Sequence, residues 1–319
     1  MTVSPVTPLP RPSITAPTVA DASRRFVRRD QFEPNTRLAY TRTLDALATA
    51  VGADTTVDTV NTYQLEDLLT DRWGTAAATT YNRHRVALLS FFGWCGERGW
   101  TRRNPASFTE PRKVRRRTED ERRDRPISPD QLTDLWLLDR VAVRDRLLWR
   151  MAYETWGRAD ELLGLDIADL DLGKREAIVH GKGGDREAVW WATGTARLLP
   201  KVIAGRRSGP LFIAARLPTR PMPPADIDPV TGRARLAYRQ AERLFTATGR
   251  RIDPDGIGWT LHRLRHSGIA HAVEAGWNLA QIRAKSRHTS LRSLEVYANP
   301  SVEAVRAMTE ALDPHNRRH

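Results

Sequence analysis

Six side chains in the second half of the sequence could together perform chemistry on a phosphodiester. In chain order they are Arg158, Lys182, His262, Arg265, His288 and Tyr297. Guanidinium groups bind phosphate oxygens and neutralise the charge that develops on them during reaction. A phenol can attack phosphorus and form a phosphotyrosine, while another group protonates the leaving oxygen. The set therefore predicts transesterification at a phosphodiester without a metal.

Each of these side chains also has an ordinary structural explanation. Arg158 opens a predicted apolar helix, where it could bind a phosphate or pair with Glu161 one turn later. Lys182 lies between two glycines at a predicted hairpin tip, where most lysines are only solvated. His262 and Arg265 are three residues apart and share one face of a predicted helix. Since a lone histidine or tyrosine is usually a packing residue, only the ordered set carries the prediction.

The elements that position this set are expected to form a domain over residues 127–319. Ser128 precedes a proline and is a good helix N-cap, so helices are predicted over 129–137 and 141–155. Short apolar runs separated by turn residues in 166–191 predict a small antiparallel sheet. From residue 195 to the end, the pattern predicts mostly helix. The sequence therefore predicts an α+β domain that is mainly helical.

A second, helical domain is predicted over residues 21–108. Apolar residues recur at helical spacing in 36–47 and in 79–94, where Val86 is expected to face the interior. Either Asn61 or Thr62 could cap a further helix between these two. We therefore expect a bundle of about four helices, and a chain that is mainly α with one small antiparallel β-sheet.

Two segments outside these domains are expected to lack a packed structure. Residues 1–20 are rich in Pro, Thr and Ser and poor in large apolar side chains, which predicts a flexible tail. Residues 109–126 carry dense mixed charge and are predicted to form a basic linker. Candidate DNA-binding residues in the bundle and the linker are Arg83, Arg85, Arg115 and Arg116.

The composition excludes several classes of protein and favours a polyanionic partner. Lys and Arg total 51 against 38 Asp and Glu, a formal net charge of +13 that favours nucleic acid or an anionic membrane surface as partner. The single cysteine, Cys95, excludes an internal disulfide and a cysteine-based zinc cluster. No apolar run could span a membrane and no signal peptide is visible, so we expect the cytoplasm, at the nucleoid. No acidic cluster has metal spacing, and neither a metal nor a cofactor is expected.

The ordered set resembles the tyrosine recombinase (phage integrase) family of site-specific DNA recombinases. The matching segments are 157–165 for the first-arginine box, 181–183 for the lysine hairpin, 261–266 for the H-x-L-R-H box, and 287–290 with Tyr297 for the final histidine and nucleophile. The resemblance covers about residues 127–300, and the 21–108 bundle is similar to the family's core-binding domain on weaker grounds. Arg287 departs from the family, which usually has glycine at this position.

The resemblance implies a role for each residue. Arg158 and Arg265 would clamp the scissile phosphate, His288 would hydrogen-bond it, Tyr297 would attack with His262 as general base, and Lys182 would protonate the leaving 5′ oxygen. Asp160 and Glu161 would support the first arginine. The resemblance also implies a 3′-phosphotyrosine intermediate, strand exchange through a Holliday junction, and a homotetramer on two double-stranded DNA sites, assembled from a chain that is a monomer or weak oligomer when free. An accessory DNA-bending protein is a further candidate partner.

Two other functions remain open from the residues. A type IB topoisomerase would cut and reseal a single duplex with similar side chains. A non-catalytic basic DNA-binding regulator would keep the charge without the chemistry. Relaxation of supercoils without recombination products would favour the topoisomerase, and DNA handling unchanged by Tyr297→Phe would favour the regulator.

Overall fold

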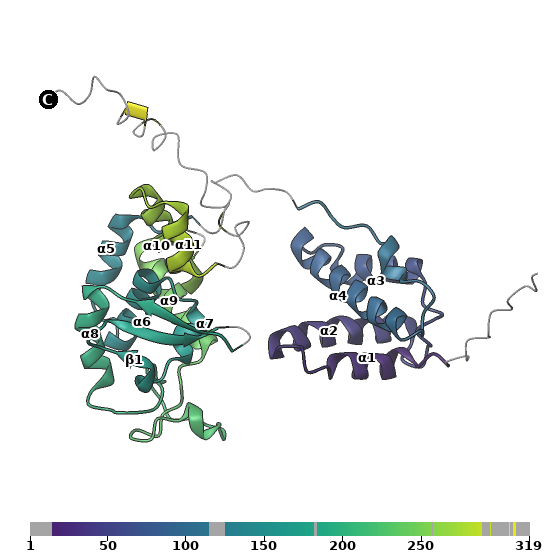
Figure 1. The fold of residues 1–319 in the computed structure, drawn as a ribbon, viewed down its shortest axis with the longest axis horizontal. Helices are drawn as coiled ribbons and strands as arrows, with labels where there is room; N and C mark the ends of the chain where they lie inside the picture. The colour runs from purple at the N-terminus through teal and green to yellow at the C-terminus, as the bar shows by residue number, and fades with distance from the viewer. Residues whose placement is uncertain are drawn as a thin grey trace, which may run out of the picture. The chain divides into compact units, whose positions relative to one another are not determined.

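The computed structural model describes residues 15–114, 125–181, 184–256 and 258–288, together with Leu294, Arg306, Thr309 and Glu310. The chain divides into two compact units between Arg116 and Arg117, drawn in purple to blue and in teal to yellow in Figure 1. Within the described ranges, no helix is long and apolar enough to cross a membrane. Each unit has its own core.

The first unit is a bundle of helices. Its elements are α1 (Val19–Val27), α2 (Pro34–Val51), α3 (Thr62–Trp73), α4 (Ala78–Glu97) and the short 3-10 helix η1 (Pro105–Phe108). Asn61 caps α3 as predicted, because its side chain accepts from Gln64 N while the Gln64 side chain accepts from Asn61 N. Phe26 of α1 and Phe91 of α4 meet edge to face in the core. Cys95 lies fully buried on α4, and burial raises the pKa of its thiol to about 12.

Two predictions about this unit are wrong. The tail was expected to extend to residue 20, but α1 begins at Val19, which is fully buried, and Thr18 caps it. The Pro17 carbonyl also accepts from Val57 N, so tertiary contacts order this end of the segment. Val86 was expected inside but is 54% exposed. The buried face of α4 is instead formed by Leu88, Phe91, Phe92 and Cys95.

The expected linker also begins later than predicted. Thr109 is buried, and its carbonyl accepts from Arg85 Nε at 2.9 Å. The Asn82 side chain bonds both the backbone N–H and the carbonyl of Arg112, each at 2.8 Å. Residues 109–112 are therefore part of the first unit, while 115–124 lie outside the described residues.

The second unit combines helices with one small sheet, as predicted (Figure 1). Its helices are α5 (Pro129–Leu137), α6 (Val143–Thr155), α7 (Ala159–Gly164), α8 (Thr193–Ile203), α9 (Tyr238–Ile252), α10 (Leu261–Glu274) and α11 (Leu279–Ser286), with 3-10 turns η3 (Ile167–Asp169) and η4 (Pro224–Asp226). The antiparallel strands β1 (Leu170–Asp171), β2 (Glu176–His180) and β3 (Arg186–Trp190) pair in that order. Helix α6 packs against both α8 and α10, and its Trp149 is buried in the core.

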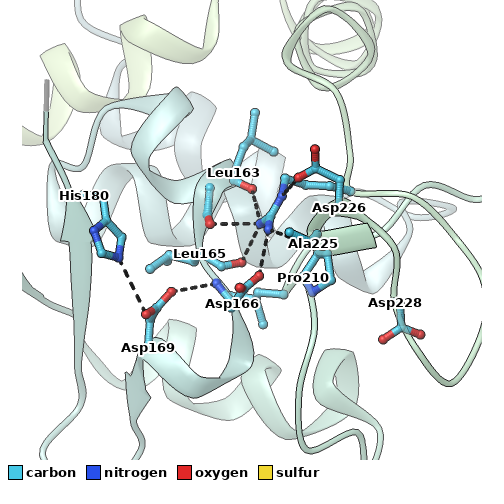
Figure 2. Close-up of polar contacts among 12 residues, drawn as sticks. Leu163, Leu165, Asp166, Asp169, His180, Pro210, Ala225, Asp226 and Asp228 are labelled. Atoms are coloured by element: carbon cyan, nitrogen blue, oxygen red, sulfur yellow. Dashed lines mark hydrogen bonds and ion pairs between the residues drawn. The ribbon is translucent and has the colours of Figure 1, made fainter. Parts of the chain in front are cut away.

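The C-terminal end of α7 is held by one arginine. The last carbonyls of a helix have no partner within the helix and lie at the negative end of its dipole. The Arg235 guanidinium donates to the carbonyls of Leu163, Gly164 and Leu165 and to the carboxylates of Asp166 and Asp226. Figure 2 labels each of these partners except Gly164. This anchor fixes the short helix whose other end begins next to Arg158.

Candidate active site

Arg158 lies between the end of α6 and the start of α7. Its backbone N–H donates to one Glu161 oxygen at 2.9 Å, and Nη1 donates to the other at 2.7 Å. The predicted pairing with Glu161 is therefore present, yet the Arg158 side chain remains 47% exposed. Gly157 allows this close turn, because a Cβ there would lie 2.7 Å from Leu162 Cδ2. Arg158 is thus held by one carboxylate while part of its guanidinium faces solvent.

Arg265 is positioned from the interior of the second unit. It lies on α10 and is only 2% exposed. Nη1 donates to the carbonyl of Trp156, the residue that ends α6 in a left-handed conformation, and Nη2 donates to the Ser286 carbonyl at 2.6 Å. His262, one turn earlier on the helix, is exposed. Two backbone carbonyls therefore fix the guanidinium before any substrate binds.

His288 lies beside this arginine. Its Nδ1 is 2.7 Å from Ser286 Oγ, and its Nε2 is 3.5 Å from Arg265 Nη2. Burial, followed by the charges of Arg265, Arg158, His262 and Arg287, lowers the pKa of His288 to about 4. The side chains that cause this shift therefore lie close enough to the imidazole to affect its charge. His288 is therefore neutral at pH 7.

The depressed pKa of His288 predicts a pH-dependent loss of stability. Between its ordinary value of 6.5 and about 4, the unfolded chain binds a proton at this residue and the folded chain does not. The free energy of unfolding should therefore fall as the pH is lowered through this window. We expect His288→Gln to lose less stability than wild type over the same window, measured by urea denaturation at a series of pH values. Parallel curves for the two proteins would contradict the assignment.

Glu161 links Arg158 to Arg287, a residue to which the sequence assigned no role in the site. Burial raises the pKa of Glu161, but hydrogen bonds from Arg287 and Arg158 outweigh it and hold the pKa below its usual value. Arg287 Nη2 donates to Glu161 Oε2 at 2.5 Å, and Nη1 donates to Glu187 Oε2 on β3 at 3.0 Å. The departure from glycine in the last motif was the only sequence signal that pointed to Arg287.

Of the other predicted residues, Asp160 and Arg83 are exposed, Arg85 bonds to Thr109 as described above, and the rest lie outside the described residues. Asp160 is exposed, and its negative charge helps to raise the pKa of Tyr238, after burial and Glu242. Arg83 is exposed and lines a groove of the first unit with Arg42 and Arg72. The remaining predicted residues, Lys182, Tyr297, Arg115 and Arg116, lie outside the described residues. Among the residues the structure describes, no group of three His, Cys, Asp or Glu side chains could hold a metal.

The sequence model for "Phage integrase family" matches residues 127–304, more than half of the chain and all of the described site. The chain belongs to the phage integrase family. It is therefore a tyrosine recombinase, an enzyme that cleaves and rejoins DNA at specific sites. This membership selects site-specific recombination from the three functions that the residues left open.

Similar proteins agree with the family assignment. Tyrosine recombinase XerC of Mycobacterium bovis (strain BCG / Pasteur 1173P2) is 31% identical over 288 residues, which are 88% of this chain and 93% of that relative. XerC of Mycobacterium tuberculosis (strain ATCC 25177 / H37Ra) gives the same values. The match extends over most of this integrase-family chain and nearly the full length of both relatives.

Two solved structures share the fold. The Tn1549 transposon integrase in complex with circular intermediate DNA has a TM-score of 0.69 at 18% identity, covering 92% of this chain and 100% of that one. A lambda integrase dimer bound to a COC' core site has a TM-score of 0.67 at 16% identity, covering 89% and 78%. At these identities the likeness confirms the predicted fold of this integrase-family member.

Proposed function

We propose that this recombinase cleaves one strand at a time by attack of Tyr297 on the scissile phosphate. The bond from the phenol oxygen to phosphorus forms while the bond from phosphorus to the 5′ oxygen breaks, giving a 3′-phosphotyrosine. His262 takes the proton from Tyr297, and Lys182 donates a proton to the leaving 5′ oxygen. The covalent bond keeps the energy needed for rejoining, so the cycle requires neither ATP nor a metal.

The convergence of Arg158, Arg265 and His288 carries this proposal. A half-exposed guanidinium, a buried guanidinium fixed by two carbonyls, and a neutral imidazole lie together at one place. The two guanidinium groups bind the non-bridging phosphate oxygens, where negative charge grows in the transition state. His288 adds a hydrogen bond to the same phosphate, and Glu161 orients Arg158 for it.

We extend the proposal to the assembly on DNA. Four copies bind two double-stranded sites and exchange one pair of strands at a time through a Holliday junction, with an accessory DNA-bending protein as a candidate partner. The net charge of +13 favours such a complex. In the first unit, Arg83 and Arg85 supply phosphate contacts together with Arg115 and Arg116 of the following segment. The reaction takes place in the cytoplasm, at the nucleoid.

Covalent trapping tests the assignment of the nucleophile. Fragmented genomic DNA from the source organism is incubated with the wild-type protein, and the DNA joined to protein is sequenced to find the site. A nicked suicide duplex built on that site is then incubated with wild type and with Tyr297→Phe, and the products are resolved on a denaturing gel. We expect a protein–DNA adduct with wild type and none with the variant, since phenylalanine has no hydroxyl to form the bond.

Three outcomes would contradict the proposal, two of them in the trapping experiment and one in a separate assay on supercoiled DNA. An adduct that survives in Tyr297→Phe would move the nucleophile to another residue. No adduct with either protein, despite tight DNA binding, would favour a non-catalytic DNA binder. Relaxation of supercoiled DNA by wild type without any recombination product would favour a topoisomerase.

A further inference from the structure

Arg287 adopts a backbone conformation that favours glycine. It follows the last residue of α11 with φ 57° and ψ 35°, in the left-handed region, and its N–H closes the helix on the Arg283 carbonyl. A side chain at this conformation strains the backbone, whereas glycine adopts it freely. The strain is tolerated only if the surrounding structure compensates for it. The contacts of the Arg287 side chain are therefore the feature to explain.

Those contacts are two ion pairs, a buried one with Glu161 and one with Glu187, whose side chain is 39% exposed. The Arg287 side chain is 5% exposed, with Nη1 on Glu187 at 3.0 Å and Nη2 on Glu161 at 2.5 Å. A planar guanidinium can hold two carboxylates at once in this way, whereas a lysine ammonium cannot match the fork. Because both terminal nitrogens donate to carboxylates, the side chain acts on its neighbours rather than on a phosphate.

One of the two carboxylate partners, Glu187, belongs to the hairpin that contains Lys182. Glu187 pairs with Val179 across β2 and β3, so it belongs to the strand that follows the hairpin tip. Its Oε2, the atom that accepts from Arg287, lies 3.9 Å from the position that a Cβ would take on Gly181. Gly181 directly precedes Lys182 in the sequence. The ion pair therefore reaches the hairpin one residue before the lysine.

The other carboxylate partner, Glu161, contacts Arg158, one of the proposed phosphate-binding groups. Glu161 accepts from Arg287 on the same oxygen that accepts the Arg158 N–H, and its second oxygen accepts Arg158 Nη1. The neighbouring residues in sequence are Ser286 and His288, which contact Arg265. Arg287 thus connects three elements, α7, β3 and the end of α11.

We propose that Arg287 is a positioning residue that sets the β2–β3 hairpin against the phosphate-binding groups of α7 and α11. The inference rests on the proposed function, in which Lys182 is the general acid. A displacement of about 1 Å at a reacting group can cost about 100-fold in rate. Loss of Arg287 should therefore impair protonation of the leaving group more than phosphate binding.

A change of leaving group separates these two effects. The suicide duplex is prepared with either oxygen or sulfur at the 5′ bridging position of the scissile phosphate. In both, the phenol oxygen of Tyr297 bonds to phosphorus and the bridging bond breaks. The 5′ oxygen needs a proton to leave. Sulfur instead departs as a thiolate, because a thiol has a pKa of about 8.5. Cleavage of the sulfur duplex is therefore insensitive to a misplaced general acid.

Three variants and one control are compared with wild type on both duplexes. Arg287→Gly removes both ion pairs and relieves the backbone strain, Arg287→Lys keeps the charge without the fork, and Glu187→Gln weakens only the hairpin contact. The control is Arg175→Gly, because Arg175 is exposed on the turn between β1 and β2 and has a similar φ of 56°. Urea denaturation and binding of the uncleaved duplex report folding and DNA affinity for each protein.

We expect Arg287→Gly to cleave the oxygen duplex at least about tenfold more slowly than wild type and the sulfur duplex at close to the wild-type rate. Arg287→Lys should show a smaller loss of the same kind. Glu187→Gln should lose rate in the same direction. Adding it to Arg287→Gly should cause no further loss, because Arg287→Gly already lacks the Arg287–Glu187 contact. Arg175→Gly should match wild type on both duplexes.

Two results would overturn this inference alone. Wild-type cleavage of the oxygen duplex by Arg287→Gly would show that the contact does not matter. An equal loss on both duplexes would mean that Arg287 supports the fold or Arg158 rather than the hairpin. A wild-type protein that forms no adduct with either duplex would overturn the proposed function together with this inference.

Discussion

Arg265→Lys is expected to lower the rate of strand cleavage by at least about 100-fold, the loss typical of removing one donor to a developing oxyanion. The guanidinium donates to the carbonyls of Trp156 and Ser286 from two different nitrogens and lies beside His288. A lysine keeps the positive charge but offers one compact ammonium, which cannot hold both carbonyls and still bind a phosphate. Single-turnover cleavage of the suicide duplex measures the loss.

A neighbouring arginine provides a control matched in burial. Arg263 is 6% exposed on the same helix, and its Nε donates to the Arg125 carbonyl. Arg263→Lys makes the same chemical change outside the site and should retain cleavage at close to the wild-type rate. Equal rates for Arg265→Lys and wild type would refute the role given to Arg265, and equal losses in both variants would point to a general effect on α10.

Arg206→Met is expected to destabilise the second unit by about 3–5 kcal/mol, since it leaves a buried carboxylate without its cation. The Asp228 side chain has no solvent exposure, and its Oδ1 accepts from Arg206 Nη1 at 3.1 Å. The same guanidinium also donates to four backbone carbonyls, those of Val202, Ile203, Pro210 and Leu211. Methionine fills much of the volume but satisfies none of these acceptors. Urea denaturation of the full chain measures the change.

The control and a double variant identify the source of this loss. Arg207→Met alters the adjacent exposed arginine and should shift the denaturation midpoint little. Arg206→Met combined with Asp228→Leu should recover part of the lost stability, because no uncompensated charge remains. A midpoint for Arg206→Met equal to that of Arg207→Met would contradict the assignment.

Local signals in the sequence predicted much of this fold because short-range chemistry determines them. Asn61 and Ser128 both form capping boxes where the cap residues indicated helix starts. The hairpin strands pair as their alternation and turn residues predicted. His262 and Arg265 share α10, as their spacing required. For Arg158, pairing with Glu161 does not exclude phosphate binding, because the paired side chain is still 47% exposed.

Features that depend on distant contacts could not be predicted in the same way. Val19 is ordered by the segment around Thr55, whose carbonyl accepts its N–H, and nothing in the first 20 residues indicates that contact. From the sequence, Arg287 indicated only that arginine stands in a turn where the family usually has glycine. Its carboxylate partners lie 100 and 126 residues earlier in the chain, so their meeting is a property of the tertiary fold alone.

Burial of Cys95 has a practical consequence for labelling. Thiol reagents attack the thiolate, and a thiol that is fully buried with a pKa near 12 forms almost none at neutral pH. Since the chain contains no other cysteine, a cysteine introduced on the surface would react alone with a maleimide dye. Fluorescent probes could then follow each unit on DNA in a protein that keeps its native core.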